Sequence, residues 1–167
     1  MTSTGTVQER AVTRMTRIEV AEARAFDSWQ DYQEALKRAI APLTEEQLGR
    51  RLVPGRRTPG EIAEHIVFGR ALHLHRTLGQ AAEELEPLIR WENSDDPPRT
   101  ADEILLGLEQ TWHVIVKHLQ RDSPTDVVDE EQTRVLQAIW GLLDHDLPHA
   151  GQLSMLLRAD GLPGVGL

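Results

Sequence analysis

Cysteine is absent from this chain of 167 residues. Its absence excludes disulfides, thiolate nucleophiles and every zinc site that uses cysteine ligands. A bound metal ion must therefore be held by histidine and carboxylate side chains. A thiol, if the protein uses one, must arrive as a small molecule.

Long apolar runs and an excess of basic residues are also missing. No window approaches the ~20 apolar residues needed to span a bilayer, and residues 1–10 lack the apolar stretch of a secretory signal. Lys and Arg number 18 against 27 Asp and Glu, which gives a formal net charge of −9. Because phosphate binding needs clustered positive charge, we expect neither nucleic-acid nor membrane partners. The sequence predicts a soluble, cytoplasmic protein that acts on a small-molecule substrate.

Strand-like alternation of apolar and polar residues is missing as well, and helical spacing takes its place. Apolar residues recur at steps of three and four in four segments, as one face of an amphipathic helix requires. These segments are 18–41, 58–79, 100–123 and 129–161. Length and a 40% hydrophobic content favour one domain over residues 1–167, with 1–16 as a loosely ordered lead-in. The sequence therefore predicts an all-α protein built as a four-helix bundle.

The boundaries and connections of these helices predict their order in the bundle. Thr58 and Glu61 form a capping box ahead of the second helix, and Thr100 and Glu103 form another ahead of the third. Between them, residues 80–99 contain several prolines and make the connection best suited to a crossover along the bundle. We therefore expect an up-down-down-up topology with a long crossover between helices two and three.

Three histidines fall on the apolar faces of two predicted helices. His145 and His149 are four residues apart, so they lie one turn apart on one face of the last helix. His65 lies between Ile62 and Ile66 on the inward face of the second helix. Three inward imidazoles can share one divalent ion and leave positions open for water or substrate. The pattern predicts a catalytic type of metal site, with open coordination positions, and not a purely structural one.

Two alternatives stay open for these histidines. The first is a plain bundle whose histidines only hydrogen-bond to core groups. The second is the zinc-protease pattern HExxH, with Asp146 in place of the glutamate. Aspartate is one methylene shorter, Pro148 interrupts the helical hydrogen bonds, and no histidine follows His149 to serve as a third ligand. The protease interpretation is therefore the weaker of the two.

Two stretches resemble a known group of proteins, the DinB/YfiT-like superfamily. They are residues 58–70 (TPGEIAEHIVFGR) and 139–164 (IWGLLDHDLPHAGQLSMLLRADGLPG). Members carry a histidine in helix two and an H-x-x-x-H pair in helix four. The resemblance implies an up-down-down-up bundle, often a homodimer, that binds a divalent metal ion, nickel or zinc, through the matching residues. These are His65, His145 and His149, and Gln152 matches a position that helps to shape the site.

The resemblance implies one function for the predicted metal site, and a rival function stays open beside it. Some relatives are similar to thiol-dependent enzymes that use mycothiol, bacillithiol or glutathione in transferase or isomerase reactions. The first implied function is a metal-dependent enzyme that activates a low-molecular-weight thiol or water for transferase or hydrolase chemistry. The alternative is a noncatalytic, metal-binding dimeric stress or interaction module. Pro148 stands directly before the last ligand, where relatives often have an aromatic residue or histidine. We expect this proline to kink the last helix between the two ligands.

Overall fold

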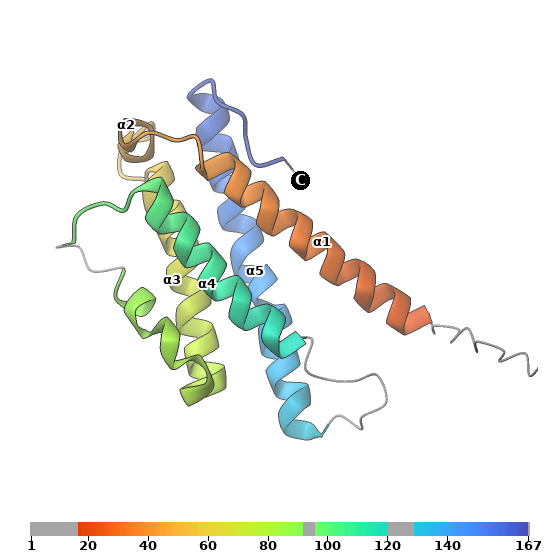
Figure 1. Ribbon diagram of the computed structural model, residues 1–167. Helices are drawn as coiled ribbons and strands as arrows, with labels where there is room; N and C mark the ends of the chain where they lie inside the picture. The colour runs from red at the N-terminus through yellow and green to blue at the C-terminus, as the bar shows by residue number, and fades with distance from the viewer. Residues whose placement is uncertain (1–16, 92–95, 120–128, 167) are drawn as a thin grey trace, which may run out of the picture.

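A computed structural model describes residues 17–91, 96–119 and 129–166, and these residues form helices and no strand (Figure 1). Five α-helices and one 3₁₀ segment are present in this part of the chain. They are α1 (Arg17–Ile40), α2 (Glu45–Gly49), α3 (Pro59–Leu78), η1 (Gly79–Arg90), α4 (Ala101–Leu119) and α5 (Glu130–Ala159). The all-α prediction is confirmed. The predicted lead-in at residues 1–16 and the predicted end of the third helix at Ser123 lie outside the described residues.

Capping boxes set the starts of the helices that carry the histidines. The Thr58 hydroxyl accepts the backbone N–H of Glu61 at 3.2 Å, and the Glu61 carboxylate accepts the Thr58 N–H at 2.7 Å. Asp129 and Gln132 form the same reciprocal pair at the start of α5. Each box satisfies two backbone donors that a helix start otherwise leaves unpaired. The sequence signals therefore fix the start of α3 and of α5.

The four long helices pack around one core, with α2 at one end, and α1 diverges from α3 and α5 toward its start (Figure 1). α1 and α5 run toward the α2 end, whereas α3 and α4 run away from it. α3 packs against η1, α4 and α5. Each long helix contributes fully buried residues to a common core, among them Leu36, Ile66, Leu108 and Leu142. Among the described residues, no helix combines the length and apolar character needed to cross a membrane.

The sequence of the predicted connection 80–99 allows a helical turn or two in its Glu-rich first half, and the structure extends this helical part. η1 runs to Arg90, and its Leu85 and Leu88 are buried in the core. α5 is α-helical on both sides of Pro148, whose side chain is exposed. The kink expected at this residue stays a prediction. The missing N–H of a proline removes one helical hydrogen bond, but the flanking turns of this long helix hold the α conformation.

Candidate metal site

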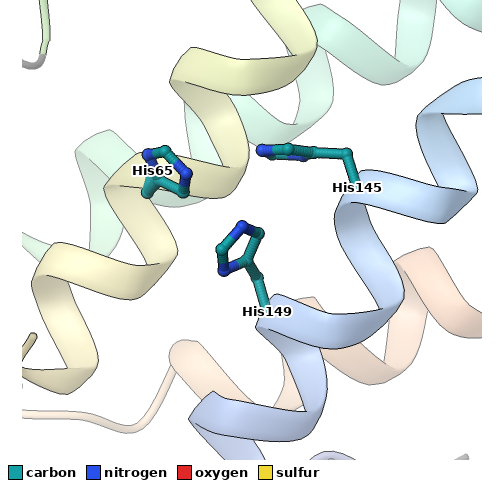
Figure 2. Close-up of side chains that lie close together, drawn as sticks. All are labelled: His65, His145 and His149. Carbon is teal, nitrogen blue, oxygen red and sulfur yellow. The ribbon is translucent and has the colours of Figure 1, made fainter.

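Three imidazoles meet between α3 and α5. His65 projects from α3, and His145 and His149 project from α5 toward it (Figure 2). The ring centroid of His65 lies 4.6 Å from that of His149 and 5.3 Å from that of His145. The two rings of α5 are 4.8 Å apart. The structure therefore brings together all three histidines that the sequence analysis selected.

The three side chains are half-buried, whereas we predicted that they point into the core. The His145 side chain is 31% exposed. The pattern of apolar residues placed these histidines on the correct helix faces, but it does not determine how far each face is covered. A half-open cluster lies at the edge of the core, where small molecules can reach it.

The donor set fits a divalent metal ion. One ligand atom from each of His65, His145 and His149 can be chosen so that all three lie within 4.8 Å of one another. Two ligands on one ion with bonds of about 2.1 Å lie at most about 4 Å apart, so the three imidazoles would have to move closer together to share an ion. Neutral imidazole nitrogens suit zinc and nickel, and three of them leave open coordination positions.

The His149 imidazole has a neighbour that fixes its orientation. Its Nδ1 lies 3.3 Å from Oε1 of Gln152, one turn further along α5. Because an amide oxygen only accepts, Nδ1 carries the proton and Nε2 keeps a lone pair for a metal ion. Burial lowers the pKa of His149, the Gln152 contact opposes this effect, and the positive charges of His145 and Arg57 lower the pKa further. The net shift favours the neutral form that binds metal.

His145 is held from two sides. Its Nδ1 lies 3.2 Å from Oδ1 of Asp146, which leaves Nε2 as the ligand atom. On the other side the ring packs directly on α3 at Gly69. A Cβ atom added to Gly69 would lie 2.2 Å from Cε1 and 2.4 Å from Nε2 of His145. Only glycine leaves room for the imidazole in this position.

Behind His145, a chain of buried polar groups crosses the core. Arg70 donates through Nε to Oδ2 of Asp146 at 2.6 Å, and through Nη1 to the side-chain oxygen of Gln33 at 2.7 Å. Gln33 in turn donates to the carbonyl of Leu108 at 3.2 Å. The side chains of Arg70 and Asp146 are fully buried. The chain of hydrogen bonds thus joins α1, α3, α4 and α5 to one of the candidate ligands.

Arg70 was not predicted as part of the site, although its position in the sequence indicates that it faces inward. Arg70 follows the buried Ile66 by one turn, and Asp146 follows the buried Leu142 by one turn. Opposite charges on the inward faces of two helices indicate a buried pair. The pairing also removes the protease interpretation, because a buried carboxylate held by Arg70 does not serve as the base of an open active site.

The model of the DinB family matches residues 15–166. A crystal structure described as that of a DinB family member from Exiguobacterium sibiricum 255-15 superposes with a TM-score of 0.56 at 22% identity, and the match covers 89% of this chain and 95% of that one. This structure supports the fold alone. No protein of curated function matches the chain. The family match spans nearly the whole sequence, so the chain belongs to the DinB family.

Proposed function

We propose that this protein is a metal-dependent enzyme that binds one divalent ion, zinc or nickel, through His65, His145 and His149. Its substrate is a small molecule, and the nucleophile is a low-molecular-weight thiol or water. The observation that carries the proposal is the convergence of three half-buried imidazoles within 4.8 Å in a DinB family chain. When bound, the ion supplies Lewis acidity, which lowers the pKa of a coordinated thiol or water toward neutral.

The residues around the histidines would keep the ligand atoms ready for the ion. Gln152 and Asp146 each accept from Nδ1 of a histidine, which directs Nε2 of both rings toward the shared site. The chain contains no cysteine, so a thiol that reacts here must be a cosubstrate. This requirement is consistent with transferase chemistry, in which the thiol attacks an electrophilic substrate and displaces a leaving group.

We also propose that the chain is a single domain with the up-down-down-up topology implied by the family resemblance. The running directions of α1, α3, α4 and α5 support this topology (Figure 1). η1 lies in the connection between α3 and α4, where a crossover is required because these two helices run the same way. The shared core of the four helices supports a single domain.

A screen of thiols against electrophiles tests the enzymatic part of the proposal. Mycothiol, bacillithiol and glutathione are each offered with a panel of electrophiles to the zinc- or nickel-loaded protein. The control is a His65→Ala, His149→Ala double variant whose helix content is checked by circular dichroism. Turnover that needs both the thiol and the intact histidines supports the proposal. Equal rates for the two proteins throughout would favour the alternative, a noncatalytic metal-binding module.

A further inference from the structure

An open cavity adjoins the histidine cluster at the α2 end of the molecule. Its volume is about 500 Å³, within the usual range for small-molecule sites. Gln152, which contacts His149, forms part of the wall. Ile62, which precedes His65 by one turn of α3, forms another part. The cavity and the candidate metal site therefore share a boundary.

The polar side of this cavity is positively charged. Arg56 and Arg57, from the loop between α2 and α3, both line it, and the described residues of its wall include no aspartate or glutamate. The same loop also carries Arg50 and Arg51, which are not part of the cavity wall. The chain as a whole has a net charge of −9, so the charge of this wall is opposite to that of the protein. It favours an anionic ligand.

The other side of the cavity is apolar and accessible. Val53 is 46% exposed and Met155 is 71% exposed, and both line the cavity together with Ile62 and Leu156. A ligand that covers exposed apolar side chains is stabilised there, because the covered apolar surface is removed from water. Methionine adapts readily to ligands of different shape. The wall is thus suited to the hydrocarbon part of a small molecule.

We propose that this cavity binds the substrate, and that the substrate is a small organic anion with an apolar body. Arg56 and Arg57 hold the anionic group, and Val53 and Met155 contact the apolar part. The contact between Gln152 and His149 places the bound molecule beside the histidine cluster. This inference rests on the proposed function, because it names the substrate class of the same site. It adds a specificity-determining pair of arginines outside the metal ligands.

The test measures binding of hexanoate to the zinc-loaded protein by isothermal titration calorimetry. Hexan-1-ol and hexylammonium serve as neutral and cationic probes of the same length. We expect hexanoate to bind more tightly than either. An Arg56→Gln, Arg57→Gln variant should bind hexanoate about tenfold more weakly, because hydrogen bonds to a charged group are lost. Met155→Ser tests the apolar wall separately and should also weaken binding. Because Met155 is exposed, this variant should keep the fold of the wild-type protein.

Arg90→Gln is the matched control, since Arg90 is an exposed arginine of η1 outside this cavity. It should leave hexanoate binding unchanged. Failure of hexanoate to bind the wild-type protein, or equal affinity in the Arg56→Gln, Arg57→Gln variant, overturns the inference. Metal content is measured on the same samples. Arginine-dependent binding without turnover would reject the proposed function alone, whereas arginine-independent binding with retained metal would reject the cavity assignment alone.

Discussion

Arg70 and Asp146 form an ion pair that is completely buried between α3 and α5. Nε of Arg70 donates to Oδ2 of Asp146 at 2.6 Å, and both side chains are 0% exposed. The other carboxylate oxygen lies 3.2 Å from Nδ1 of His145. The pair therefore connects the packing of the core to the orientation of a candidate metal ligand.

Removing one partner of this pair should destabilise the protein strongly. Arg70→Met leaves the Asp146 carboxylate buried without its cation, and we expect the free energy of unfolding to fall by about 3–5 kcal/mol. Urea denaturation followed by circular dichroism measures the change. Arg90→Met is the control, because Arg90 forms an exposed ion pair with Glu86, and its loss should cost at most about 1 kcal/mol.

The double variant Arg70→Met, Asp146→Leu separates charge burial from packing. Without either charge, the core no longer holds an uncompensated ion, so much of the lost stability should return. A double variant as unstable as Arg70→Met would show that shape, and not the unpaired charge, dominates at this position.

Gly69→Ala should weaken metal binding without a general loss of structure. The new Cβ would lie 2.2 Å from Cε1 of His145, so the imidazole must move out of its position. We expect zinc affinity to fall by about tenfold or more, measured by competition with a chromophoric chelator. Gly151→Ala in α5 is the matched control, because its Cβ would have no atom within 4 Å. Equal zinc affinity in the two variants would contradict the proposed packing.

Tyr32 should remain protonated far into the alkaline range in the folded protein. Burial raises its pKa, the charge of Asp146 raises it further, and the nearby guanidinium of Arg70 offsets part of the effect. The ordinary pKa of tyrosine is about 10. Above that pH the folded state binds more protons than the unfolded state, so the free energy of unfolding should decrease as the pH rises.

The chain has a single tyrosine, so the ultraviolet absorbance of tyrosinate reports this residue alone. The folded protein should show no tyrosinate near pH 10, and the urea-unfolded protein should titrate there. Ionisation at the same pH in both states would mean that Tyr32 is not buried beside the pair.

The histidine cluster could be predicted from the sequence because helical periodicity is local. Spacing of four residues places His145 and His149 on one face, and the flanking isoleucines place His65 on the inward face of its helix. Their partial exposure could not be predicted, since it depends on how closely α3 and α5 approach. The close approach at Gly69 is likewise a tertiary contact.

The partner of Arg70 and the place of the cavity could not be predicted from the sequence, for different reasons. Spacing from buried residues indicates that Arg70 and Asp146 face inward, but the two are 76 residues apart, and no local rule says that they pair with each other. Arg56 and Arg57 belong to a loop without periodicity, so their position beside Gln152 follows only from the packed structure. The helix starts at Thr58 and Asp129, by contrast, depend on residues three apart and were predicted correctly.

Metal analysis of protein purified without an affinity tag tests the central claim most directly. Inductively coupled plasma mass spectrometry should find about one divalent ion per chain in the wild-type protein and in His113→Ala, which removes an exposed histidine of α4. The His65→Ala, His149→Ala variant should contain none while it keeps its helical circular dichroism spectrum. Full retention of the ion by that variant, or a wild-type protein that binds no divalent ion when one is supplied, would contradict the account.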